Sequence, residues 1–66
     1  MKVLNDLREK YNLSISRLVV NLNNNYGKDF RICQVWDWEN GYRRVSENDI
    51  AILADYFNVS KQTFSA

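Results

Sequence analysis

The sequence predicts a compact all-α domain of five short helices that spans residues 1–66. Apolar residues recur at three- and four-residue spacing along most of the chain, which is the pattern of helices with one buried face. There is no proline, and the two glycines, Gly27 and Gly41, lie where two of these patterns end. A chain of 66 residues that is 45% hydrophobic has room for one small core, so a single domain is expected.

The first two helices are predicted from the residues that would begin and end them. The first covers about residues 2–11. The second begins after Ser14, whose hydroxyl can accept a hydrogen bond from the first turn, and runs to about Asn25. Residues 23–25 are all asparagine and are expected to fray before Gly27 ends the helix in a left-handed conformation. The two apolar faces are predicted to hold Val3, Leu4, Leu7, Tyr11, Ile15, Leu18, Val19 and Leu22.

Three further helices are predicted after a connector at residues 28–31. The third begins at Ile32 and ends at Gly41, residues 42–45 form a loop, and the fourth follows the capping residue Ser46. The apolar stripe of the fourth helix is formed by Ile50, Leu53, Ala54 and Phe57, and Asn58 ends this helix. Ser60 can cap the fifth helix, in which Thr63 and Phe64 are expected to pack on the core.

The composition argues against several classes of function. Cys33 is the only cysteine and there is no histidine, so neither an internal disulfide nor a common zinc site is available, and no cofactor is expected. Cys33 is interpreted as a small apolar residue rather than a reactive thiol. No nucleophile–base pair or glycine-rich phosphate loop is evident, so neither enzymatic activity nor a small-molecule substrate is expected. No stretch has the length of a membrane span, and we expect a cytoplasmic protein that does not enter a membrane.

Charge is distributed unevenly along the chain. The net charge of +1 gives no electrostatic signature of nucleic-acid binding by itself. Residues 1–44, however, carry eight Lys/Arg against five Asp/Glu, whereas residues 45–66 carry one against three. This asymmetry favours a binding face in the N-terminal two thirds.

Several segments occur together in a characteristic order. They are Leu7-Arg8-Glu9-Lys10, Leu13-Ser14, Leu18, Val35, Trp38-Glu39-Asn40-Gly41 and Leu53-Ala54-Asp55-Tyr56-Phe57-Asn58-Val59-Ser60. Over nearly the whole chain they resemble the Cro/CI-type (XRE-like) helix-turn-helix repressor family, as a small phage-repressor-like member. The resemblance implies a lambda-repressor-like helix-turn-helix domain and a role in transcription regulation.

Arg8 and Glu39 are expected to form a buried or half-buried ion pair. Glu39 lies near the end of the third helix, where the helix dipole disfavours an acid, so it needs a cation. Arg8 on the first helix is the expected partner, in a bidentate geometry. The alternative is that Glu39 is a solvated surface acid.

The chain also departs from the family's pattern. The turn between the second and third helices is enlarged by several residues, around Asn23 to Asp29. Ile15 stands where relatives often have a glutamine that touches phosphate, and Val19 replaces a small alanine. These changes weaken the implied DNA-binding function without removing the fold.

The leading hypothesis is a DNA-binding regulator whose third helix enters the major groove of an operator, as a homodimer on a pseudo-palindromic site. Gln34 would read a base, preferably adenine, and Cys33 and Asp37 would face the groove beside it. The cations expected to hold phosphates are Lys28, Arg31, Arg43 and Arg44. From charge alone, the two loop arginines could equally be solvated.

The alternative is an anti-repressor or modulator that keeps the fold but binds a repressor protein. Ile32, Trp36 and Asp37 would form that interface, with the acid imitating phosphate toward a basic surface. Trp38 is expected in the core, whereas Trp36 is expected to be partly exposed.

Overall fold

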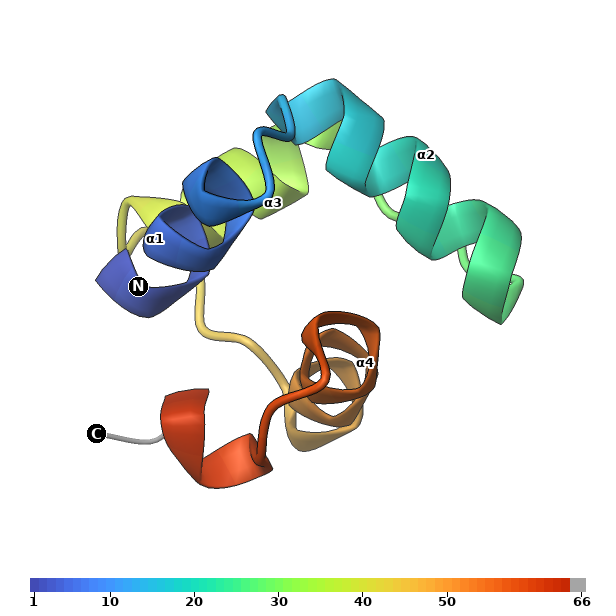
Figure 1. The fold of residues 1–66 in the computed structure, drawn as a ribbon. Coiled ribbons are helices and arrows are strands. Elements are labelled where there is room, and N and C mark those ends of the chain that lie inside the picture. Colours follow the sequence, from blue (N-terminus) through green and yellow to red (C-terminus); the bar gives the residue numbers. More distant parts are fainter. Residues whose placement is uncertain (65–66) are drawn as a thin grey trace.

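The computed structural model describes residues 1–64, and within that range the chain consists of helices and loops without a strand (Figure 1). Its elements are α1 (Lys2–Lys10), α2 (Ile15–Tyr26), α3 (Ile32–Glu39), α4 (Glu47–Phe57) and the 3-10 turn η1 (Lys61–Phe64). The all-α prediction is confirmed for the described residues. The count of five α-helices is not, because residues 61–64 form only a short 3-10 turn.

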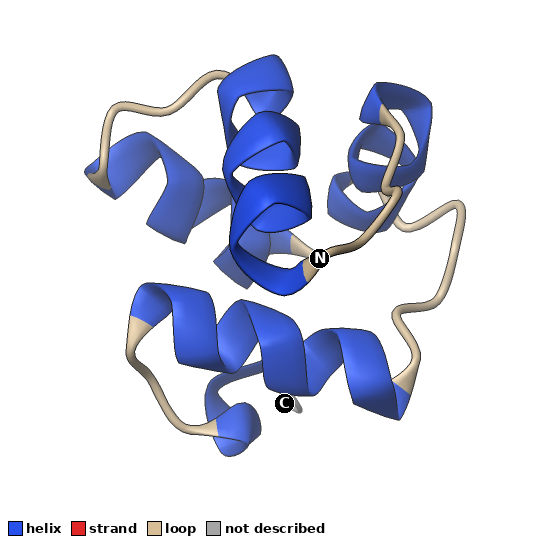
Figure 2. Cartoon of the chain, turned by 90° about the vertical axis from the view of Figure 1, so that its right-hand side faces the viewer, coloured by secondary structure: helices blue, strands red, loops and turns tan. Residues whose placement is uncertain are grey.

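The helices lie in two groups around one core. α1, α2 and α3 lie together, and α4 with η1 lies on the other side, reached through residues 42–46 (Figure 1, Figure 2). Trp38 is 1% exposed, and the Phe30 ring packs edge-on against it with the centroids 5.4 Å apart. Every element contributes to the core: Leu4, Leu18, Val19, Leu22, Phe30, Val35, Trp38, Val45, Leu53, Ala54, Phe57 and Phe64. Each helix of the described part is too short or too polar to cross a membrane.

Ser14, Gly27, Ser46 and Asn58 begin and end α2 and α4 as expected from the sequence. The hydroxyls of Ser14 and Ser46 each accept a hydrogen bond from the backbone amide three residues later, at 3.1 and 3.2 Å. Gly27 ends α2 with φ +62°, and Asn58 ends α4 with φ +56°. Both residue types tolerate this left-handed conformation, so these ends are encoded locally.

Residues 23–25 do not fray. α2 continues through Tyr26, because the half-buried Asn23 bonds to the connector that follows. Its side-chain oxygen accepts from the Phe30 amide at 2.8 Å, and its side-chain nitrogen donates to the Phe30 carbonyl at 3.0 Å. The enlarged turn is therefore partly extra helix and partly a connector held by one side chain.

Three other expectations about the elements are wrong in detail. α3 ends at Glu39, two residues before Gly41, because Asn40 already has non-helical capping geometry. Tyr11 lies beyond the end of α1 and is half exposed, although its ring stacks on Phe57 with the centroids 5.8 Å apart. Thr63 is exposed, since a single 3-10 turn can direct only one side of itself at the core. Phe64 makes that contact instead.

The ion pair expected between Arg8 and Glu39 is present and bidentate. Arg8 Nε donates to Glu39 Oε2 at 2.7 Å and Nη2 donates to Oε1 at 3.1 Å. The guanidinium also donates to the Leu13 carbonyl at 2.7 Å and to Asn5 Oδ1 at 2.9 Å. The Glu39 side chain is only 5% exposed, which excludes the solvated alternative. The hydrogen bond to Glu39 is the main reason that the pKa of Arg8 is raised.

Replacing Arg8 with alanine should strongly destabilise the protein. The Glu39 carboxylate would remain buried without its cation, and we expect the free energy of unfolding to fall by about 3–5 kcal/mol. Urea unfolding followed by circular dichroism measures this. As a control, Arg17→Ala removes an exposed arginine and should change stability by less than about 0.5 kcal/mol. The double variant Arg8→Met/Glu39→Leu should recover most of the loss, and a melting temperature of Arg8→Ala equal to that of the wild type would contradict the role of the pair.

Tyr26 should make stability fall at alkaline pH. Its hydroxyl donates to Asp55 Oδ2 at 2.6 Å, and desolvation, followed by this hydrogen bond, raises the pKa of Tyr26 to about 12. The pKa of tyrosine in the unfolded chain is about 10, so folding favours the protonated hydroxyl of Tyr26. The stability that this hydroxyl contributes is complete below about pH 10 and is lost as the pH rises through about 12. The urea midpoint measured across this window should fall less steeply for Tyr26→Phe than for the wild type. Parallel curves for the two proteins would be evidence against the linkage.

Candidate functional site

The outward side of α3 is mostly apolar. Ile32 is 54% exposed and Trp36 is 47% exposed, and Cys33 is exposed between them. Asp37, one residue further on, is half-buried. Trp38 belongs to the core, as expected from the sequence, so the two tryptophans lie on opposite sides of the helix. We call Ile32, Cys33, Trp36 and Asp37 the α3 face.

The side chain of Gln34 hydrogen-bonds to the backbone at the start of α3. Its side chain turns back, and Oε1 accepts a hydrogen bond from the Arg31 backbone amide at 3.3 Å. A bidentate contact to adenine needs both the oxygen and the nitrogen of the glutamine amide. Because Oε1 is turned back toward the helix start, Gln34 does not present both groups outward, and the expected base contact requires its side chain to reorient. The side chain of Arg31 is exposed beside the first turn.

The connector before α3 is held close to the core. Asn23 bonds to both backbone polar groups of Phe30, and the ring of Phe30 is buried against Trp38. The Lys28 ammonium lies over this ring, 5.7 Å from its centroid. Lys28, expected to hold phosphate, is therefore placed at the connector rather than on the α3 face.

The last turn of α3 has all four of its carbonyl groups hydrogen-bonded, although such groups lack partners within a helix. The Trp36 carbonyl accepts from the backbone amide and the side-chain nitrogen of Asn40, and the Asp37 carbonyl accepts from the amides of Tyr42 and Arg43. The Trp38 carbonyl accepts from the Gly41 amide. The Met1 α-amino group donates to both the Trp38 and the Glu39 carbonyls. Gly41, with φ +77°, allows the reversal that these bonds require. The chain after α3 is thus folded back against its end.

This reversal places Tyr42 beside Trp36. The two rings are nearly parallel, with an angle of 7° between their planes and 5.7 Å between their centroids. Tyr42 is 76% exposed, so the stacked pair extends the apolar surface of the α3 face rather than burying it. An offset stack of this kind favours one relative orientation of the two rings.

Asp37 is accompanied by a cation. Arg43 Nε lies 3.7 Å from Asp37 Oδ2, in a pair whose arginine is largely exposed. An unpaired acid on this face would repel phosphate, but Arg43 compensates the charge of Asp37 locally. The same contact engages one side of the guanidinium that was expected to clamp phosphate.

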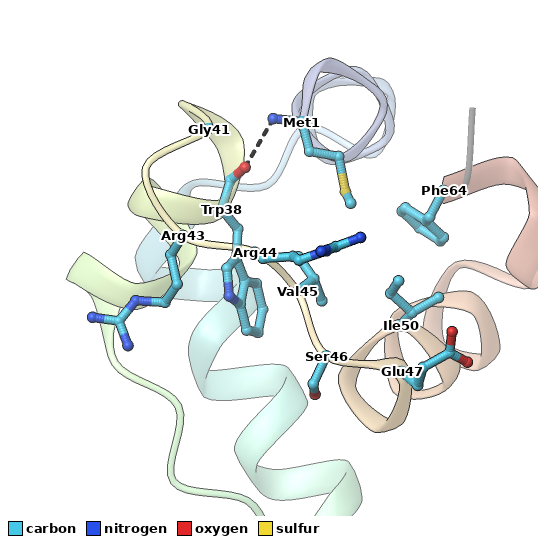
Figure 3. A pocket seen from close by; sticks show the side chains of 10 residues that line it. All are labelled: Met1, Trp38, Gly41, Arg43, Arg44, Val45, Ser46, Glu47, Ile50 and Phe64. Carbon is cyan, nitrogen blue, oxygen red and sulfur yellow. Dashed lines mark hydrogen bonds between the residues drawn. The ribbon is translucent and has the colours of Figure 1, made fainter.

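Arg44 does not lie on the same side as Arg43. Both arginines line a hollow between the α3 end and α4, but Figure 3 shows the Arg44 side chain extending across the hollow and the Arg43 side chain turned outward. Met1, Ile50 and Phe64 line the hollow around Arg44. The two arginines that were expected to act together therefore face different sides of the loop.

Lys2 is a neighbour of the α3 face that sequence reasoning did not find. It lines a small hollow together with Ile15 and Trp36, at the point where α1 and α2 begin near the end of α3. No local pattern marks Lys2, since the crossing of α1 over α3 exists only in the folded chain. Tyr42 was also missed, although a bulky aromatic in a polar loop after Gly41 was a usable signal.

Among residues 1–64, no group of three or more Cys, Asp or Glu side chains is arranged to hold a metal ion. Comparison of the chain with known protein families, with curated proteins and with solved structures found no match.

Replacing Asn23 with alanine should destabilise the fold through the connector. The Phe30 amide and carbonyl would lose their partners in a partly buried position, so we expect the free energy of unfolding to fall by about 1–3 kcal/mol. Asn24→Ala, the exposed neighbouring position on the same helix, is the matched control and should be nearly neutral. Thermal melts of the two variants provide the comparison, and equal stability would contradict the bridging role of Asn23.

Proposed function

We propose that this chain is a small DNA-binding transcription regulator of the Cro/CI type, with a lambda-repressor-like helix-turn-helix domain whose helix α3 enters the major groove. The observation that carries the proposal is the exposed face of α3, bordered by cations at both ends. Arg31 stands at its start, and Lys2 and Arg43 stand near its end. An α-helix with its side chains is about 10–12 Å across, and the major groove is about 12 Å wide.

The electrostatics of the α3 face are compatible with DNA. Asp37 is the acid nearest to the groove in this proposal, and Arg43 lies beside it, so the pair presents little net negative charge. Arg31 is exposed and can reach phosphate without first breaking an ion pair. Contacts of this kind position a helix, whereas the side chains between them read the bases.

A homodimer on a pseudo-palindromic operator belongs to the same proposal. Two copies of α3 would then enter successive major grooves on one side of the duplex, about one helical turn apart. Two-fold symmetry in the preferred duplex would be its signature.

A repressor protein is the second candidate partner. The exposed surface formed by Ile32, Trp36 and Tyr42 favours it, because aromatic residues concentrate at protein interfaces. The acid expected to imitate phosphate in that role, Asp37, is however already accompanied by Arg43. We therefore place DNA first.

Binding to DNA should depend steeply on salt. Duplexes enriched from a randomised library are titrated by fluorescence anisotropy at several salt concentrations, and the logarithm of the affinity should fall linearly with a slope of about −0.9 per phosphate neutralised. Arg31→Ala and Arg43→Ala should each flatten that slope by about one. Lys61→Ala, which removes an exposed cation on η1, should leave it unchanged.

Failure to enrich any duplex, or binding that does not change with salt, would overturn the DNA-binding proposal. In that case, capture of a helix-turn-helix repressor that is lost on Trp36→Ala would support the second candidate.

A further inference from the structure

Few polar side chains of α3 are available to hydrogen-bond a base. The Gln34 oxygen caps the start of the helix, and the Asp37 carboxylate faces an arginine at 3.7 Å. Cys33 offers only a weak S–H donor. The largest exposed groups on this helix are the apolar side chains of Ile32 and Trp36.

Ile32 and Trp36 form one preorganised apolar surface. They are four residues apart on α3, and residues with this spacing are neighbours on a helix surface. The Trp36 ring is held nearly parallel to the Tyr42 ring, at an angle of 7°. This contact favours one orientation of the Trp36 ring before any partner arrives, which reduces the conformational entropy lost on binding.

The major groove offers one apolar group to such a surface. Thymine carries a C5 methyl group, whereas the other features that distinguish base pairs there are hydrogen-bond donors and acceptors. An apolar surface gains free energy by covering a methyl group, but it leaves the amino group of cytosine or adenine without a partner.

We infer that the α3 face recognises thymine, and that Ile32 and Trp36 do so by packing against its C5 methyl group. This inference rests on the DNA-binding function proposed above. It assigns the specificity of α3 to apolar contacts, in place of the base contact that the sequence suggested for Gln34.

The charges around the α3 face are complementary to duplex DNA. Arg31 lies at one end of the apolar surface, and Lys2 and Arg43 lie near the other. The major groove is complementary to this surface, because thymine methyl groups lie on its floor and negatively charged phosphates lie along both of its edges. Cations that flank an apolar strip are therefore complementary to thymine-containing duplex DNA.

The test replaces thymine by deoxyuridine, which removes only the methyl group. Each thymine of a duplex enriched from the randomised library is substituted in turn, and the Kd is measured by fluorescence anisotropy at constant salt. At the thymines covered by Ile32 or Trp36, we expect the Kd to rise about three- to fivefold per methyl group removed. Thymines outside the contact should show no change.

Variants then assign the effect to the two side chains. Ile32→Ala and Trp36→Ala should bind thymine and deoxyuridine duplexes with equal affinity at the contacted position. Arg43→Ala is the matched control, because it should weaken binding to both duplexes by the same factor and keep their ratio. All three positions are exposed, and circular dichroism checks that each variant is folded.

The two levels of the proposal fail in different ways. If no duplex is enriched or bound, the DNA-binding function is wrong and the inference falls with it. If a duplex is enriched but every deoxyuridine substitution leaves the Kd unchanged, DNA binding stands and thymine recognition by methyl contact is overturned. Thymine recognition by these two side chains is also overturned if Trp36→Ala and Ile32→Ala both retain the full ratio.

Discussion

Arg8 holds together the three helices that carry the candidate site. Its guanidinium donates to Asn5 in its own helix, to the Leu13 carbonyl between α1 and α2, and to both carboxylate oxygens of Glu39 at the end of α3. Glu39 lies at the negative end of the α3 dipole and is nearly buried, so it is tolerated only beside a cation. The planar fork of arginine suits this role, since it satisfies partners in several directions at once. This side chain thus ties the end of α3 to α1 and to the chain between α1 and α2, beside the hydrogen bonds from the Met1 α-amino group to the Trp38 and Glu39 carbonyls.

What the α3 face presents follows from how that end is completed. The last-turn carbonyls of α3 need donors, and they obtain them by folding the next residues back on the helix. This reversal brings Tyr42 over Trp36 and Arg43 beside Asp37. The stacked rings enlarge the apolar part of the surface, while the arginine compensates its acid. The chemistry offered to a partner is thus a consequence of backbone hydrogen bonding as much as of the residues on α3 itself.

Features with a local cause were predictable from the sequence. Ser14 caps α2 through a contact within a few residues of itself, and the need of Glu39 for a cation pointed to Arg8 even across the chain. Features that depend on how segments cross were not predictable. Asn23 bridges a connector whose path is not written in any periodicity, and Lys2 reaches the α3 face only because α1 crosses the end of α3. The directions of the two loop arginines have the same origin, because identical neighbouring residues give no signal of which side each will take.

The hydrogen bond between Gln34 and the Arg31 amide makes the start of α3 self-contained. The amide groups at a helix start lack partners within the helix, and Gln34 Oε1 supplies one to Arg31 at 3.3 Å. A partner that drew this side chain away would leave the amide to solvent, at a cost of about 1 kcal/mol. The first turn of α3 therefore keeps its shape through a contact of its own, and the exposed positions of Ile32 and Trp36 do not wait for a partner to order them.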